Sequence, residues 1–164
     1  MNFWLRIKGA MARFFIYNKV MDIFGGRIRF MISGAAPISP DIFHYINWMG
    51  IDVDEGYGMT ETAGVISANR PGIVKIGSLG QALQDTQIKI AEDGEICVRA
   101  PQNISGYYKN KEATDELLHP GKNGELWLHT GDVGYLDEED FLFITDRKKD
   151  ILITAGGKNV APQN

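Results

Sequence analysis

The sequence predicts an α/β fold in which a short parallel α/β unit is followed by a β-rich region. Between residues 27 and 58, an apolar strand, a tight turn, a helix and a second strand follow one another, an order that implies parallel pairing. From about residue 73, short alternating segments are separated by polar, glycine-containing turns, as in a small barrel or sandwich. After Asp150 a further apolar segment begins, and we expect it to open another unit.

The composition excludes several classes of protein. With 164 residues, 44% of them hydrophobic and 23% charged, the chain is expected to be a soluble globular domain or part of a larger one. A net charge of −4 with scattered Lys and Arg argues against nucleic acid as a partner. Charges interrupt the N-terminal apolar residues too often for a secretory signal. The single Cys97 fits a reducing compartment, so we expect a cytoplasmic protein.

The first predicted element is a helix over residues 3–24, in which apolar residues recur near one face. A pair of glycines ends it. We favour a helix that packs this face against the core; a basic amphipathic helix on a membrane surface is the alternative. The three tryptophans, Trp4, Trp48 and Trp127, are likewise expected in the core.

The parallel unit begins with an apolar strand that ends at Ser33, in the small-residue turn SGAAP. Ser39 is a good N-cap and Pro40 a good first residue for the next helix, which Gly50 ends. A second strand over residues 51–58 then runs into the segment GYGMTETAG.

The clearest element of the β-rich region is a hairpin around an Asp-Gly turn, the strongest short hairpin signal. Ile88 and Ile90 alternate before the turn, and Ile96 and Val98 alternate after it. Further short strands follow, and the only helix expected among them covers residues 110–119.

Four segments at strand ends carry residues suited to a ligand site. In GYGMTETAG, the glycines allow a ligand to approach the backbone closely, and the ring of Tyr57 can face a base. The hydroxyl of Thr60 suits a phosphate oxygen, and the carboxylate of Glu61 suits magnesium. SGAAP offers small residues that could accommodate a planar ring. HTGD offers a carboxylate that can accept hydrogen bonds from a ribose diol, and DRKKD is a charged segment that could connect two domains. Each segment alone is explained at least as well by an ordinary turn or a solvated linker.

The histidines give no sign of a metal site. His44, His119 and His129 lie far apart, with no carboxylate or cysteine at ligand spacing, so we predict neither a zinc site nor a catalytic triad. Cys97 lies in a hairpin strand, where we expect it to be packed and inert.

The order and separation of the segments resemble the adenylate-forming synthetases. SGAAP, GYGMTE, GEICVRAPQNISGYY, WLHTGD and DRKKDILITAGGKNVAP are similar to five consecutive signatures of that family, and cover nearly everything from residue 25 onward. The wording of SGAAPISP and DRKKDILITAGGKNVAPQN is most similar to the long-chain fatty acyl-CoA ligases. The resemblance implies that a fatty acid and ATP, with Mg²⁺, form an acyl-adenylate, from which coenzyme A displaces AMP to give a thioester.

The resemblance also implies the architecture. The chain would be the C-terminal part of the family's large domain, a partial α/β sheet plus a small β-barrel subdomain, ending at the start of the small C-terminal domain. Residues 1–72 would carry the adenine and magnesium motifs, residues 73–146 the barrel with the ribose-binding aspartate, and residues 147–164 the hinge and the first residues of the next domain.

Individual roles follow from the same resemblance. Tyr57 resembles the aromatic that stacks on adenine, Thr60 the hydroxyl that contacts phosphate, and Glu61 the carboxylate associated with magnesium. Asp132 resembles the residue that holds the ribose hydroxyls, with Arg147 as its companion. The catalytic candidates are Thr60, Glu61 and Lys149, the last at the hinge. The other implied residues form the adenine pocket and the loop of the pantetheine tunnel: Ser33, Gly34, Ala35, Ala36, Gly56, Gly58, Gly156 and Gly157.

Several expectations concern what the chain does alone. Neither an SGTTG-like loop to close over the phosphates nor the late lysine that contacts the reacting carboxylate is found, so we expect weak nucleotide binding and no adenylation.

Ile32, Ser33 and Gly56 are candidates for the acyl pocket, and a fatty substrate is compatible with peripheral membrane contact. The alternatives are an aryl- or medium-chain ligase, an amino-acid-adenylating domain, or a non-catalytic remnant of the fold.

Overall fold

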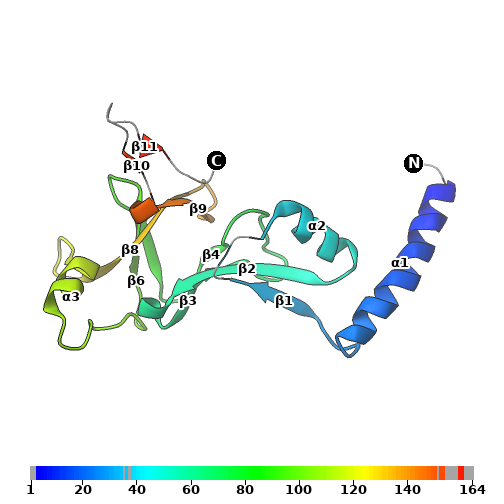
Figure 1. Ribbon diagram of the computed structural model, residues 1–164, viewed down its shortest axis with the longest axis horizontal. Coiled ribbons are helices and arrows are strands. Elements are labelled where there is room, and N and C mark those ends of the chain that lie inside the picture. Colours follow the sequence, from blue (N-terminus) through cyan, green and yellow to red (C-terminus); the bar gives the residue numbers. More distant parts are fainter. Residues whose placement is uncertain (1–2, 35, 37, 151, 154–158, 161–164) are drawn as a thin grey trace.

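The molecule is elongated, with helix α1 at one end and a β-rich part that carries helix α3 at the other (Figure 1). The computed structural model describes residues 3–34, 36, 38–150, 152–153 and 159–160. The elements are α1 (Phe3–Ile23), β1 (Phe30–Ser33), α2 (Pro40–Trp48), β2 (Asp52–Met59), η1 (Thr60–Thr62), β3 (Gly64–Ala68), β4 (Gln81–Ala82), β5 (Gln87–Ile90), β6 (Glu95–Arg99), α3 (Lys111–Leu117), β7 (Leu118–Pro120), β8 (Leu126–Leu136), β9 (Leu142–Arg147), η2 (Lys148–Asp150), β10 (Leu152–Ile153) and β11 (Asn159–Val160).

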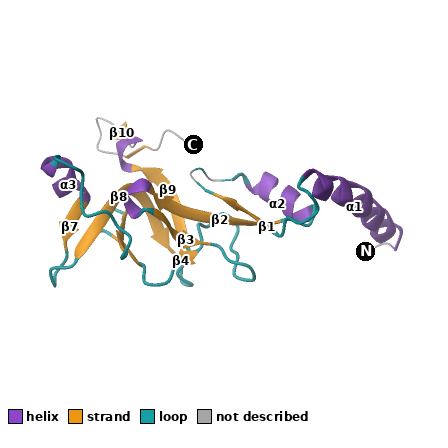
Figure 2. Ribbon diagram, turned by 90° about the horizontal axis from the view of Figure 1, so that it is seen from below, coloured by secondary structure: helices purple, strands orange, loops and turns teal. Residues whose placement is uncertain are grey.

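The first sheet contains the predicted parallel unit. Its strand order is β1-β2-β3-β4, and β1 pairs parallel with β2 from Phe30↔Asp52 to Ser33↔Glu55. Helix α2 connects these two strands (Figure 2). The sequence signals at its ends are confirmed, since Ser39 Oγ accepts a hydrogen bond from the Ile42 backbone N–H at 3.3 Å and Gly50 follows the C-terminal end with φ +91°.

The second sheet contains the predicted hairpin. Its order is β5-β6-β8-β7, with β9 also paired to β8, and its pairings are antiparallel. Ile88 pairs with Val98 and Ile90 with Ile96, as the alternation around the Asp-Gly turn predicts. A β-rich region is thus confirmed, whereas its closure into a barrel stays a prediction.

A buried core joins the two sheets. Tyr57 and Ile66 come from the first sheet, and Ile96, Val98 and Leu142 from the second, and together they form one hydrophobic cluster. The backbone N–H of Leu142 donates to Gly80 O at 2.9 Å, and its carbonyl accepts from Leu79 N at 2.8 Å. These bonds link β9 to the two residues directly before β4. The junction between the sheets is therefore held by apolar packing and by backbone hydrogen bonds.

The expectation of a core-packed first helix is wrong in this structure. The side chains of Trp4, Phe14 and Ile23 are 71%, 64% and 80% exposed. Helix α1 approaches the rest of the molecule at Tyr17, whose ring lies so close to Gly50 that a Cβ there would be 2.5 Å from Cε2. The expected apolar face is wrong as well, because the apolar side chains are distributed around α1 instead of gathering on one side. Among the described residues, nothing packs over the exposed ones.

The core assignment of the tryptophans fails for a similar reason. Trp48 is 50% exposed, because α2 buries Phe43 rather than the end of the helix. Trp127 is half-buried on β8, and the Lys89 ammonium lies 3.9 Å from its ring centroid.

After η2, strands β10 and β11 pair antiparallel and begin the further segment. Within the described part of the chain, none of the helices has the length and apolar character needed to cross a membrane.

Candidate functional site

A cavity of about 410 Å³ lies where the carboxyl ends of β1 and β2 face the β8–β9 hairpin. Ligands of open α/β sheets collect at such strand ends. Most of the predicted nucleotide-binding residues that the structure describes line it. They are Ser33, Ala36, Gly56, Tyr57, Gly58, Asp132 and Arg147. The structure thus brings together residues that lie up to 114 positions apart in the chain, from Ser33 to Arg147 (147 − 33).

Asp132 is held between two partners at this cavity. The Tyr57 hydroxyl donates to Asp132 Oδ2 at 2.5 Å, and Arg147 Nε donates to Oδ1 at 3.1 Å. Asp132 and Arg147 are also partners in the β8–β9 register. Burial, and then the hydrogen bond to Asp132, raises the pKa of Tyr57, so the phenol stays protonated and acts as the donor. The result is an oriented carboxylate that can accept further hydrogen bonds from a ligand diol.

The glycines beside Tyr57 serve the sheet itself. A Cβ at Gly58 would lie 2.0 Å from the backbone oxygen of Gly64, where the β2–β3 register shifts. A Cβ at Gly56 would meet Val65 Cγ1 at 3.3 Å, a milder approach. Gly58 therefore permits the close crossing of β3, in addition to any role in admitting a ligand.

Thr60, Glu61 and Lys149 do not line the cavity. Thr60 and Glu61 lie in the short turn η1 that follows β2, and Lys149 is exposed in η2. Gly34 follows β1 without lining the cavity, and a Cβ on it would meet Gly56 O at 3.4 Å. Ala35, Gly156 and Gly157, which the sequence also suggested, lie outside the described residues.

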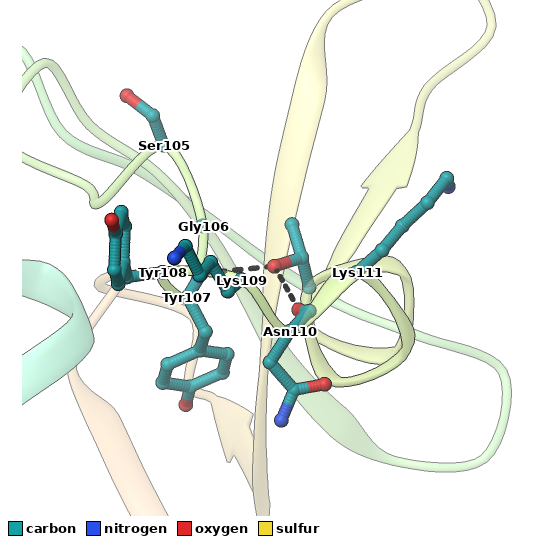
Figure 3. Close-up of a pocket in the computed structure, with 8 residues that line it drawn as sticks. Ser105, Gly106, Tyr107, Tyr108, Lys109, Asn110 and Lys111 are labelled. Carbon is teal, nitrogen blue, oxygen red and sulfur yellow. Dashed lines mark hydrogen bonds between the residues drawn. The ribbon is translucent and has the colours of Figure 1, made fainter.

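Glu61 has an unpredicted partner, Tyr107. The Tyr107 hydroxyl donates to Glu61 Oε1 at 2.6 Å, and this bond raises the pKa of the phenol. Tyr107 belongs to the loop before α3, which lines an open cavity of about 680 Å³. Thr114 Oγ1 accepts from Tyr107 N at 2.9 Å and donates to Asn110 O at 2.8 Å. Figure 3 shows Tyr107 and Asn110 among the residues that line this cavity. The GYY signature could have drawn attention to Tyr107, but not to its contact across 46 residues.

Glu55 is a second residue that sequence reasoning missed. Its side chain lines the cavity although the residue is only 3% exposed, and Oε1 accepts a hydrogen bond from Ile38 N at 3.2 Å. Burial raises the pKa of its carboxyl, an effect that the Ile38 bond opposes. Oε2 is buried with no hydrogen-bond partner among the described residues. A buried carboxylate oxygen without a partner is costly, which agrees with the raised pKa of this carboxyl.

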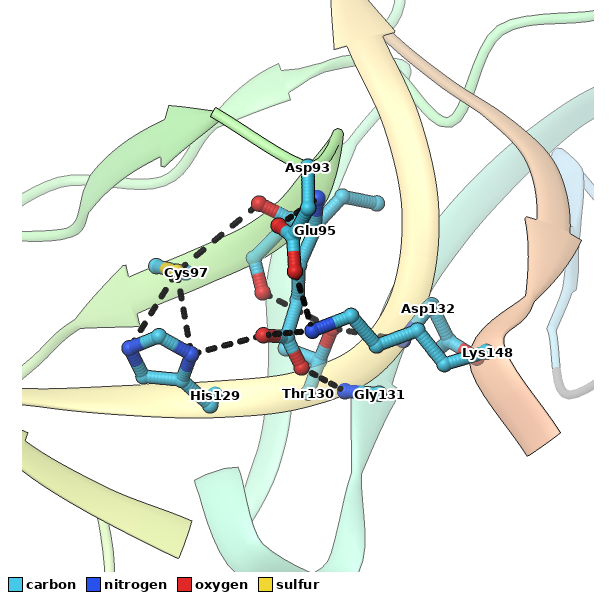
Figure 4. A network of polar contacts seen from close by, with 9 residues as sticks. Asp93, Glu95, Cys97, His129, Thr130, Gly131, Asp132 and Lys148 are labelled. Carbon is cyan, nitrogen blue, oxygen red and sulfur yellow. Dashed lines mark hydrogen bonds and ion pairs between the residues drawn. The ribbon is translucent and has the colours of Figure 1, made fainter. Parts of the chain in front are cut away.

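A buried polar network lies behind residues 130–132 of β8, where Gly131 has φ +74°, a segment that we call the Asp132 turn (Figure 4). The sequence suggested that a strand ends here in a glycine turn, but β8 continues through it. Glu95 Oε2 accepts from His129 Nδ1 at 2.7 Å and from Lys148 Nζ at 2.7 Å, while Oε1 accepts from Gly131 N at 2.8 Å. The expected isolation of the histidines is wrong. His119 and His129 lie on adjacent strands with ring centroids 4.0 Å apart, and His129 contacts both a carboxylate and a cysteine. Strand pairing, which sequence spacing does not reveal, brings them together.

The donor set Glu95, Cys97 and His129 has the composition of a metal site, since its ligand atoms lie within 4.8 Å of one another. Its geometry instead fits a hydrogen-bonded network. Both Glu95 oxygens already accept hydrogen bonds, and Cys97 Sγ lies 3.6 Å from each ring nitrogen of His129, so it is not aligned with the lone pair of either one. Burial raises the pKa of the Cys97 thiol to about 11, so the thiol stays protonated. The predicted packing of Cys97 is confirmed by its complete burial, and its lack of reactivity stays a prediction.

The cavity at the strand ends, the Tyr57 ring and the oriented Asp132 carboxylate together form a candidate small-molecule site. The chain belongs to the AMP-binding enzyme family, whose model matches residues 4–108. It is 41% identical over 96% of its length to a long-chain-fatty-acid–CoA ligase of Mycobacterium bovis, and 39% identical over 88% to a 2-succinylbenzoate–CoA ligase of Listeria monocytogenes. The chain spans 26% and 31% of the lengths of these two relatives.

A solved structure agrees with the fold. The O-succinylbenzoate coenzyme A synthetase of Bacillus subtilis, in complex with ATP and a magnesium ion, superposes with a TM-score of 0.71 at 35% identity. The match covers 82% of this chain and 30% of that one. The mixed α/β architecture is thus that of part of the large domain of an adenylate-forming enzyme.

Proposed function

We propose that the chain is part of an ATP-dependent acid–CoA ligase whose acid is a long-chain fatty acid. The reaction would join the carboxylate to the α-phosphate of ATP with loss of pyrophosphate. The thiol of coenzyme A would then attack the acyl carbon and release AMP. The observation that carries the proposal is Asp132, held between the Tyr57 hydroxyl and Arg147 at the cavity.

The nucleotide would occupy the cavity of about 410 Å³. Adenine would lie against Tyr57 and the small residues at the end of β1, in the part of the cavity that Glu55 also lines. Asp132 would accept hydrogen bonds from the ribose hydroxyls, and Arg147 would balance its charge. These residues orient the nucleotide so that its phosphates extend along the end of β2.

The phosphates and their magnesium ion would meet the η1 turn. Thr60 offers a hydroxyl, and Glu61 offers a carboxylate, a hard oxygen ligand of the kind that magnesium prefers. The ion, when bound, would neutralise phosphate charge. The Tyr107 hydroxyl would orient Glu61 before the nucleotide arrives.

The choice of acid is the finer part of the proposal. A long-chain substrate is supported by the 41% identity to a long-chain ligase and by the SGAAPISP and DRKKDILITAGGKN segments. An aryl acid is the second candidate, because a 2-succinylbenzoate ligase is 39% identical. Pyrophosphate exchange by the full-length protein that contains this chain, with fatty, aryl and amino acids in parallel, would identify the acid. Exchange with aryl acids alone would overturn the long-chain choice.

Coenzyme A would be the second co-substrate, and no nucleic acid is a partner in this proposal. Cys97 as the single cysteine favours a reducing compartment such as the cytoplasm, and a fatty substrate would favour peripheral membrane contact. Lys149 would lie at the point about which a following domain turns. Fractionation of cells that express the full-length protein would test the cytoplasmic location and the membrane contact.

Nucleotide binding tests the site itself. Titration of the chain with AMP, followed by amide chemical shifts, should move the signals of Tyr57 and Asp132. Asp132→Ala should weaken binding roughly ten- to a hundredfold, as expected for about 1.5–3 kcal/mol from hydrogen bonds to a charged group. With ATP, Glu61→Ala should remove the increase in affinity caused by magnesium, whereas Glu116→Ala, an exposed glutamate of α3, should keep it. Equal binding by all four proteins would favour a non-catalytic remnant.

A further inference from the structure

We propose that Glu95 is a positioning residue that couples the Asp132 turn to the segment after β9, through its ion pair with Lys148. The proposal rests on the proposed function in one respect only, namely that a nucleotide binds at Asp132. Glu95 does not touch the cavity; it would act through the backbone of β8.

Glu95 is suited to this role because it is buried and charged. It is 5% exposed, and its two oxygens accept hydrogen bonds from His129, Gly131 and Lys148. Burial raises the pKa of the carboxyl, but the bonds from Lys148, His129 and Gly131 outweigh burial and lower it overall. A buried carboxylate with its partners in place is rigid, and the loss of one partner is costly.

The turn before Asp132 is fixed to β6 at two points. Gly131 has φ +74°, a conformation that glycine adopts easily, and its N–H donates to Glu95 Oε1 at 2.8 Å. Thr130 Oγ1 donates to Ile96 O at 2.9 Å and accepts from Asp132 N at 3.1 Å. The backbone that aims Asp132 into the cavity is therefore held by Glu95 and by its neighbour on β6.

The last residue of β9 and the residue that follows it hold this region from two sides. Arg147 binds Asp132 at 3.1 Å, and the next residue, Lys148, binds Glu95 at 2.7 Å and Asp93 at 2.6 Å. In Figure 4 the Lys148 side chain extends past Gly131 to meet Glu95 and Asp93. Any movement that withdraws Lys148 removes one partner of Glu95, and the altered carboxylate changes its bond to Gly131. Nucleotide binding and the position of this segment are thereby linked.

The test compares lysine variants by the backbone signals of the Asp132 turn. Lys148→Met should move the amide signals of Gly131 and Asp132 and weaken AMP binding about five- to tenfold. Lys148→Arg, which keeps the charge, should restore both. The matched control is Lys75→Met, because Lys75 also pairs with two carboxylates, Asp137 and Glu139, but at the closed end of the β8–β9 hairpin.

The outcomes separate this proposal from the proposed function. Unmoved Gly131 and Asp132 signals in Lys148→Met, or equal shifts in Lys75→Met, would overturn the coupling. A purely structural role would give a loss that Lys148→Arg does not rescue. If the unaltered chain fails to bind AMP while the signals still respond to Lys148, the structural coupling between Lys148 and the Asp132 turn stands, whereas the nucleotide site proposed at Asp132 falls. Lys148 is 37% exposed in its side chain, so its replacement leaves the core intact.

Discussion

Gly58 shows how a single residue serves both the sheet and the site. It lines the cavity beside Tyr57, and it also permits β3 to cross at a distance that excludes any side chain. The motif GYG alone suggested an approach by a ligand, whereas the backbone of Gly64 is the neighbour that the structure reveals.

Gly58→Ala should therefore destabilise the chain by about 1–3 kcal/mol, the usual range for overpacking. A Cβ 2.0 Å from Gly64 O forces the two strands apart. The measurement is urea denaturation followed by circular dichroism. Gly9→Ala is the control, because nothing lies within 4 Å of a Cβ there and alanine favours the helix by up to about 1 kcal/mol. Equal stability of Gly58→Ala and the unaltered chain would contradict the clash.

Cys97 should resist alkylation in the native protein. Its thiol is fully buried, and a pKa of about 11 leaves roughly a hundredfold less thiolate at pH 8 than an ordinary cysteine has. The measurement is the rate of reaction with iodoacetamide, monitored by mass spectrometry, in buffer and in urea. Rapid alkylation in buffer, at the rate seen in urea, would show that the β6–β8 region opens readily.

At the scale of residues, the sequence identified the groups that belong to local motifs. Tyr57, Asp132 and Arg147 were predicted from their segments and meet at one cavity. Glu55 and Glu95 were missed, because their importance depends on burial and on partners from distant strands. No local pattern distinguishes a buried carboxylate from an exposed one in an alternating strand.

At the scale of elements, local signals succeeded where they act locally. The cap of α2 depends on Ser39 and Pro40, and the hairpin on its Asp-Gly turn, so neighbouring residues decide both structures. The environment of α1 depends instead on what packs over it, which periodicity does not reveal. Its apolar residues were therefore placed in a core that the described residues do not provide.

Helix α1 should exchange its amide hydrogens at least tenfold faster than β6 and β8. Its large apolar side chains are mostly exposed, so little packing opposes local opening. Hydrogen exchange monitored by mass spectrometry measures this difference, and α2, which buries Phe43 and packs on β2, serves as the internal control. Protection of α1 equal to that of β8 would mean that the helix is packed in solution, for example in an oligomer.

At the scale of the whole molecule, the chain brings residues from both sheets to one cavity. It supplies the cavity, the Asp132 carboxylate and the η1 turn, and it spans 26% of the length of the M. bovis ligase. The parallel unit, the hairpin and their order followed from the sequence. The joining of the two sheets through one core did not, because it requires contacts between Tyr57 and residues about 40 to 85 positions later.

The isolated chain should show no fatty-acid-dependent exchange of pyrophosphate into ATP. The sequence contains no SGTTG-like loop to close over the phosphates, so transition-state charge would lack stabilisation from that side. The assay follows labelled pyrophosphate with palmitate as the acid, and the full-length protein is the positive control. Exchange by the chain alone that requires both the fatty acid and Asp132 would refute the expectation.

Tyr57 belongs to the core that joins the sheets and to the wall of the cavity at the same time. A screen that scores activity and a screen that scores abundance would therefore both report damage at this position, for unrelated reasons. Removal of the ring alters both properties, whereas Tyr57→Phe deletes only the hydroxyl that contacts Asp132. That one oxygen atom is the means by which the contribution of this residue to ligand recognition can be measured apart from its contribution to folding.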